Sequence, residues 1–165
     1  MRCTRMTTAR AARCARWVAA ALFAVTSAHA MASGVDSVDS ALQEANRRTV
    51  LAFYEKGLNE KDADAALAYV GDQYVQHNPN AADGREGFRK FVAFLRDTYP
   101  QSHSEIKRSF VDGDYVILHV HAVREPGTRG SAIVDIFRLA HGKIVEHWDV
   151  NQPVPEHAAN GNTMF

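Results

Sequence analysis

The chain has 165 residues, with 19 Lys and Arg, 19 Asp and Glu, and two cysteines. Both cysteines, Cys3 and Cys14, and five of the arginines fall in the first 30 residues, which leaves 14 Lys and Arg against 19 Asp and Glu afterwards. This balance argues against nucleic acid and anionic membranes as partners, and the later residues lack any thiol for a disulfide, nucleophile or metal ligand. The remaining length suits one domain.

The first 30 residues have the pattern of a cleavable signal peptide. Their basic start contains no acidic residue, the apolar run 17–25 is too short to span a membrane, and Ala28-His29-Ala30 is an A-x-A cleavage signal. We expect cleavage after Ala30 and a periplasmic or secreted mature protein without a membrane segment. Residues 31–40 are expected to form a flexible leader.

Three helical segments are expected next. Apolar residues at helical spacing predict a helix from Ser40 to about Leu58, and a shorter helix at 65–70 follows the cap sequence 61–64. A third helix opens at Gly84 and Arg85 and is stopped by Pro100. Between the second and third helices, residues 74–80 read as a short extended piece ended by turn residues.

The rest of the chain predicts strands. Residues 105–111 and 115–124 flank Asp112-Gly113-Asp114, a strong hairpin signal, and 131–140 and 143–151 form a second pair. The expected fold is α+β, with three N-terminal helices packed on a strongly curved antiparallel sheet around a cavity. One domain is expected over 41–153, followed by a tail at 154–165.

Asp135 is the anomaly in the second hairpin, since it alternates with Ile133 and Phe137 on an apolar face. A three-residue loop at 140–142 closed by a G1 bulge is favoured there, which pairs Asp135 with His147 and places Asp149 on the same face. A two-residue loop would instead shift the pairing by one residue and bring Trp148 to that face.

Two further histidines are candidates for the same pocket. His119 and His121 share one face of their strand, and a loop centred near Thr128 would place His121 opposite Asp135. Together with His147 and Asp149, these groups suit proton transfer in a closed apolar cavity. The same histidines with Asp135 could alternatively bind zinc or iron. The sequence has no G-x-S-x-G elbow, phosphate loop or dinucleotide fingerprint.

Several runs of the chain resemble the SnoaL-like polyketide cyclases, and most closely the branch of predicted aldol-condensation-catalysing enzymes. The resemblance spans roughly Leu42 to Pro153. It is carried by Lys61-Asp62, the runs YVQHNP at 74–79 and DGREGF at 83–88, GDYV at 113–116, DIFR at 135–138, and GKIVEHWDV at 142–150.

The resemblance implies a fold, a chemistry and an oligomeric state. The fold is the cystatin-like α+β cone of the nuclear transport factor two-like and ketosteroid isomerase-like superfamily, often dimeric through the sheet. In such cyclases an aspartate near the end of the last long strand, matched here by Asp149, acts as general acid/base without metal or cofactor. Asp135 stands where some cyclases have an assisting histidine, and His77 would lie at the cavity mouth.

Three hypotheses about function follow. The first is a cofactor-free lyase, cyclase or isomerase that removes a proton next to a carbonyl of a small hydrophobic substrate, with Asp149 as base and Asp135, His121 or His77 polarising the oxygen. The second is a periplasmic binder of a small apolar ligand, and the third a metal-dependent enzyme using His119, His121 and His147. A homodimer is expected, and residues expected to contact the ligand are Tyr54, Tyr74, His119, Phe137, His147 and Trp148.

Overall fold

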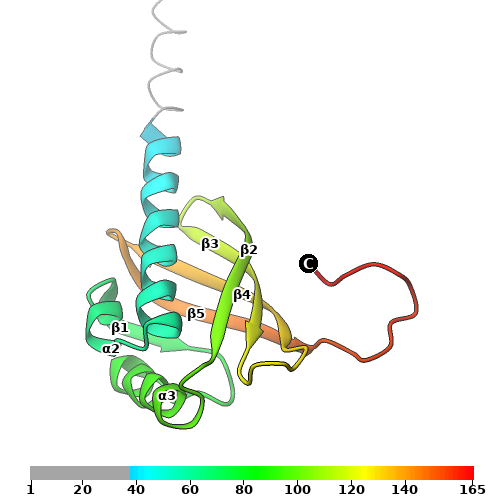
Figure 1. Cartoon of the computed structure of the whole chain (residues 1–165). Helices are drawn as coiled ribbons and strands as arrows, with labels where there is room; N and C mark the ends of the chain where they lie inside the picture. The colour runs from blue at the N-terminus through cyan, green and yellow to red at the C-terminus, as the bar shows by residue number, and fades with distance from the viewer. Residues whose placement is uncertain (1–37) are drawn as a thin grey trace, which may run out of the picture. The chain divides into compact units, whose positions relative to one another are not determined.

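A computed structural model describes residues 38–165, and the predicted signal peptide with most of the leader lies outside the described residues (Figure 1). Residues Ala41–Phe165 form one compact unit. The first helix covers residues 38–54 and continues as the π-helical segment η1 (Glu55–Asn59). No helix among the described residues is long and apolar enough to cross a membrane.

Two further helices lie close to their predicted positions. Helix α2 (Ala63–Leu67) begins after Asp62, whose side chain accepts a hydrogen bond from Ala65 N and so satisfies a free amide of the first turn. Helix α3 (Gly84–Thr98) ends two residues before Pro100, which cannot continue a helix. The buried face of α3 consists of Gly87, Phe88, Val92 and Leu95.

The sheet has five strands in the order β1-β5-β4-β3-β2 (Figure 1). The strands are β1 (Val70–Gln76), β2 (His103–Asp112), β3 (Tyr115–Val123), β4 (Ser131–Ala140) and β5 (Lys143–Pro153). The α+β class and the curved sheet are as predicted. The sheet is mixed, however, because β1 pairs in parallel with β5 at its edge. Residues 74–76, expected only as an extended piece, are part of this strand, and β1 precedes α3 rather than following all helices.

The β4–β5 hairpin differs from the favoured turn. Ala140 pairs with Lys143, so the loop has two residues, and His141 and Gly142 both have positive φ, 51° and 72°. The register then shifts by one residue between Arg138 and Leu139, which restores the faces that the expected bulge would have given. Asp135 therefore pairs directly with Asp149, not with His147, while all three side chains still share one face.

The core lies between the helices and the face of the sheet that carries Asp135, here called the inner face. Leu118, which pairs with Asp135, is fully buried on it, as are Val116 and Val120. The ring of Phe53 from the first helix packs 4.9 Å from that of Phe88 in α3 and 5.7 Å from that of Phe137 in β4 (centroid distances). These packed rings do not fill all of the space over the inner face, and a cavity remains there.

Candidate active site

A cavity of about 450 Å³ lies between the inner face, the end of the first helix and α3. Its walls are mostly apolar or aromatic, and one group of polar side chains lies on β1, β4 and β5. This combination of an apolar pocket with a few convergent polar groups is typical of a small-molecule site. The polar lining on these strands consists of Tyr74, Gln76, Asp135, His147, Asp149 and Asn151.

Asp135 is the centre of a buried hydrogen-bond network. It is only 5 % exposed, and its two carboxylate oxygens have different partners. Tyr54 donates its hydroxyl to Oδ2 at 3.1 Å, and His147 Nε2 lies 3.0 Å from Oδ1. These partners explain how a carboxyl group is tolerated on an apolar face.

The other nitrogen of His147 determines where the protons lie. Gln76 Oε1 accepts a hydrogen bond from the backbone N–H of Asn78 at 2.8 Å, so this atom must be the amide oxygen. His147 Nδ1 lies 2.9 Å from the same oxygen and must therefore carry a hydrogen. The contact between His147 Nε2 and Asp135 then needs one further proton. This proton is either on Nε2, which gives an imidazolium beside a carboxylate, or on Asp135, which gives a carboxylic acid beside a neutral imidazole. Asp135 and His147 form an acid pair with one shared proton.

Asp149 is the second carboxylate of the site. It lies directly across from Asp135 in the β4–β5 ladder, lines the cavity and is only partly buried. Asn78 Nδ2 donates to its Oδ2 at 2.7 Å. That amide orients the carboxylate without neutralising it, so Asp149 is an accessible carboxylate next to the acid pair.

Two buried tyrosines complete the polar wall. Burial, strengthened by the nearby Asp135 carboxylate, raises the pKa of the Tyr54 hydroxyl well above its usual range. Burial raises the pKa of Tyr74 in the same direction. Both hydroxyls therefore remain protonated near neutral pH; that of Tyr54 donates to Asp135, and that of Tyr74 accepts from Gln76 Nε2 at 3.2 Å.

Two residues that position this site were not predicted, Gln76 and Asn78. The signal was present, because the period of two in a strand puts Gln76 on the same face as Tyr74 and puts His77 on the other. His77 is instead stacked on Trp148 with centroids 4.7 Å apart, and its Nε2 is 2.9 Å from Glu146 Oε1. The expectation of His77 at the cavity mouth and of Trp148 against the ligand is wrong, since neither lines the cavity.

His119 and His121 also lie on the outer face, the side opposite Asp135. Asp135 pairs with Leu118, whereas His121 pairs with Ala132, so the expected register is wrong by three residues. His121 Nε2 lies 2.8 Å from the carbonyl oxygen of Arg129, and both histidine rings pack against Phe165. His119 and His121 therefore do not contact the cavity.

The proposed metal ligands do not meet. His147 is on the inner face and His119 and His121 are on the outer face, so one ion cannot bind all three. Among residues 38–165 no group of three or more His, Cys, Asp or Glu side chains has a geometry that could hold a metal ion. Of the expected ligand contacts, Tyr54, Tyr74, Phe137 and His147 do line the cavity.

The fold and the cavity define a class of small α+β proteins with a curved sheet and a pocket beneath it. The sequence profile of the SnoaL-like domain family matches residues 50–147. The chain belongs to this family. No curated protein matches the sequence.

Solved structures with this fold include proteins of several assigned functions. A cystatin fold protein from Novosphingobium aromaticivorans is 27 % identical, with a TM-score of 0.55 and coverage of 64 % of this chain and 97 % of its own. A candidate polyketide cyclase from Acidithiobacillus ferrooxidans is 18 % identical, with a TM-score of 0.55 and coverage of 65 % and 87 %. A candidate ketosteroid isomerase from Kribbella flavida is 17 % identical, with a TM-score of 0.58 and coverage of 72 % and 85 %. The fold is thus polyketide cyclase-like and ketosteroid isomerase-like.

Proposed function

We propose that this protein is an enzyme that moves a proton next to a carbonyl group of a small hydrophobic substrate, as a lyase, cyclase or isomerase of the aldol type. The observation that carries the proposal is the pairing of Asp149 with Asp135 across the ladder, one hydrogen-bonded to Asn78 alone among residues 38–165 and the other holding a shared proton with His147. Pairs of titratable groups in unlike environments are typical of acid/base sites.

The geometry supports two distinct roles. Asp149 takes the proton from the carbon next to the carbonyl, since its carboxylate is accessible and held only by Asn78. Negative charge then develops on the carbonyl oxygen, and the Asp135–His147 pair transfers its shared proton to that oxygen, which leaves a carboxylate beside a neutral imidazole. Tyr54 and Gln76 position that pair. All steps use protein groups.

The rest of the cavity limits the substrate. A volume of about 450 Å³ falls in the range of small-molecule pockets, and aromatic rings of Phe53, Phe88 and Phe137 line it. These walls favour an apolar or aromatic carbonyl compound and exclude water from the acid pair, which strengthens the electrostatic interactions there.

Deuterium exchange tests the proposal without knowledge of the natural substrate. The mature chain is incubated with 2-tetralone in D₂O, and loss of the signal of the protons next to the carbonyl is followed by proton NMR. We expect catalysed exchange, and the substitution Asp149→Asn lowers its rate by about 10²–10⁴-fold, the usual contribution of a positioned base.

The matched controls are His77→Gln and His121→Gln, which change titratable residues of the outer face. We expect both variants to keep the exchange rate within about twofold of wild type. Equal rates for wild type and folded Asp149→Asn would overturn the assignment of the base. Tetralone binding without exchange would favour the second candidate function, a binder of apolar ligands.

Two expectations from the sequence, export and homodimer formation, remain part of the proposal. The basic and apolar pattern of residues 1–30 supports export, and the N-terminal residue of the protein recovered from the producing cell tests it. Exposed apolar side chains on the outer face, among them Tyr115, Val134 and Val150, support a dimer. Sedimentation of the mature chain tests that state.

A further inference from the structure

The cavity extends beyond the acid pair to an end formed by β2, β3 and α3. Arg124 follows directly after β3 and lines both the cavity and the adjoining surface hollow. It is an exposed cation at the rim of an apolar space. None of the ion pairs among residues 38–165 involves Arg124.

Two aromatic rings hold the guanidinium in place. Its Cζ lies 5.7 Å from the ring centroid of Phe91 and 5.6 Å from that of Tyr99, both within cation–π range. Such contacts do not by themselves use the N–H donors of the guanidinium. A planar guanidinium presents a fork of donors that matches a carboxylate.

Ser102 supplies an independent observation at the same end. His103 pairs with Val123, so Ser102 and Arg124 lie next to each other just beyond the last pair of the β2–β3 ladder. The backbone of Ser102 is fixed, because its N–H donates to Tyr99 O at 2.9 Å and its carbonyl accepts from Lys61 Nζ at 2.9 Å. Ser102 lines the cavity, and its hydroxyl oxygen is nevertheless buried without a hydrogen-bond partner among the described residues.

A buried hydroxyl without a partner costs free energy, and a bound acceptor would remove that cost. We propose that Arg124 and Ser102 form a carboxylate-binding subsite, and that the substrate is an amphipathic keto acid whose carboxylate occupies this subsite while its carbonyl reaches Asp135. This inference rests on the proposed function for the carbonyl end and on Arg124 and Ser102 for the acid end.

The sheet sets an upper limit for the length of such a molecule. Asp135 pairs with Leu118, and Arg124 is six residues further along the chain from Leu118. At about 3.3 Å per strand residue the two ends are at most about 20 Å apart along the strand, and the Arg124 side chain reaches back over part of this span. A chain or ring system of intermediate length therefore fits between them.

Calorimetric binding with two probes tests the subsite. The probes are 8-benzoyloctanoate, an aryl ketone with a distant carboxylate, and its neutral primary amide. We expect the mature chain to bind the carboxylate about 10–100-fold more tightly than the amide, as for hydrogen bonds to charged groups. Arg124→Gln removes this preference, and Ser102→Ala reduces it.

Arg129→Gln is the matched control, because Arg129 lines the surface hollow but not the cavity. This variant keeps the preference, and Arg124→Lys retains part of it through charge alone. Equal affinity of the wild type for both probes, or no binding of either, would overturn the subsite. A circular-dichroism melt confirms that each variant is folded.

The same probes separate this inference from the proposed function. If Asp149→Asn keeps the carboxylate preference and neither chain catalyses deuterium exchange, the subsite stands and the catalytic proposal fails. If the wild type exchanges neutral 2-tetralone but shows no carboxylate preference, the catalytic proposal stands and the subsite fails.

Discussion

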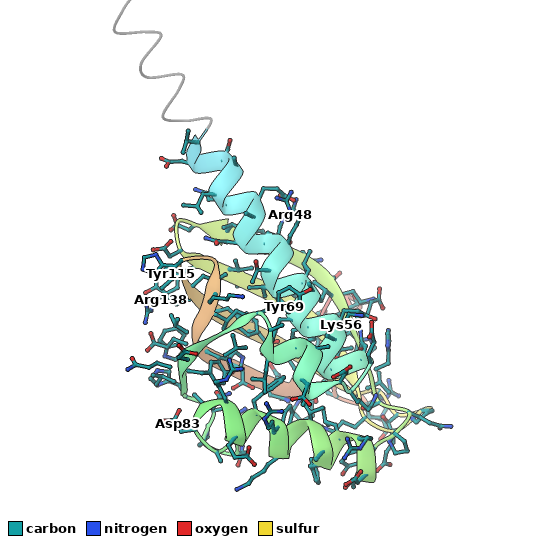
Figure 2. The ribbon with its side chains drawn as sticks, turned by 90° about the vertical axis from the view of Figure 1, so that its left-hand side faces the viewer. Arg48, Lys56, Tyr69, Asp83, Tyr115 and Arg138 are labelled. Carbon is teal, nitrogen blue, oxygen red and sulfur yellow. The ribbon has the colours of Figure 1, made fainter. Side chains whose placement is uncertain are left out.

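The two faces of the sheet carry similar residues under opposite conditions. On the inner face, Asp135 and His147 are 5 % and 8 % exposed and bond to each other. On the outer face, His77 and Glu146 also form a pair, and Arg138 Nε donates to the same carboxylate at 2.7 Å. Figure 2 shows Arg138 beside Tyr115, its cross-strand partner, at one end of the sheet.

The difference teaches that the environment of a histidine–carboxylate pair, rather than the two residue types, makes the pair a candidate for acid/base chemistry. The outer pair has an arginine at hand and hydrogen bonds that lower the pKa of Glu146, with His77 and Arg138 as the main causes. A carboxylate held ionised in this way is a poor acid and a weak base. The hydrogen-bond partners of the inner pair in residues 38–165 are neutral side chains, and no Lys or Arg is among them. The pair faces a mostly apolar cavity.

The largest effect that tests this comparison is on stability. Leu118→Ala removes a fully buried side chain behind Asp135 and should lower the free energy of unfolding by about 2–5 kcal/mol. Val134→Ala, at a position 40 % exposed on the outer face, should change it by about 0.5 kcal/mol or less. Urea denaturation measures both. Similar losses would mean that the outer face is also covered in solution, as in a dimer.

Alkaline pH should destabilise the protein through its inner face. The folded state raises the pKa of Tyr54 and Tyr74, so the unfolded chain releases these protons first, and the stability they contribute is lost as pH rises above about 10. At pH 11 the loss is up to about 1.4 kcal/mol for each tyrosine.

The variant Tyr54→Phe isolates one of these contributions. At pH 8 this variant should be less stable than wild type, because Asp135 loses a hydrogen-bond donor. Its free energy of unfolding should, however, fall less than that of wild type between pH 8 and pH 11. Urea denaturation at the two pH values measures the difference. An unchanged pH dependence would show that Tyr54 is exposed to solvent.

The smallest effect belongs to the outer face. The folded state lowers the pKa of Glu146. The contribution of Glu146 to the free energy of unfolding is therefore complete above its pKa in the unfolded chain, about 4.3, and is lost as pH falls through its pKa in the folded state. Partly solvated ion pairs contribute below about 1 kcal/mol. Glu146→Gln should therefore reduce the stability difference between pH 6 and pH 3 by less than that amount. Thermal melts at both pH values measure it, and a larger reduction would mean that the outer pair is buried.

Much of the fold could be predicted because its signals are local. Helical spacing, the cap at Asp62, the stop at Pro100 and the turn at Gly113 each act within a few residues, and the predicted strand pairs are present. The parallel pairing of β1 with β5 has no local signal, since the partners are about 70 residues apart. Of the strand at 70–76, only residues 74–76 were therefore predicted to be extended.

The candidate site shows the same division. The prediction that Asp135, His147 and Asp149 share one face is correct although the expected turn was wrong. The two-residue loop and the later bulge together shift the pairing by an even number of residues, so each side chain stays on its expected face. For His121 the connection to β4 set the register, and a shift of three residues put its side chain on the other face. The resemblance implied a place for His77 at the cavity mouth, although the alternation with Tyr74 already indicated the outer face.

The sequence by itself determined the helices and the strands of the two hairpins, which aspartate is anomalous on an apolar face, and which family the chain resembles. Only the tertiary structure decided which histidine shares a proton with Asp135, that Gln76 and Asn78 hold the site, and that Arg124 and Ser102 lie at its far end. The physical reason is that periodicity fixes alternation within a strand, whereas register, pairing partner and burial depend on contacts between distant parts of the chain.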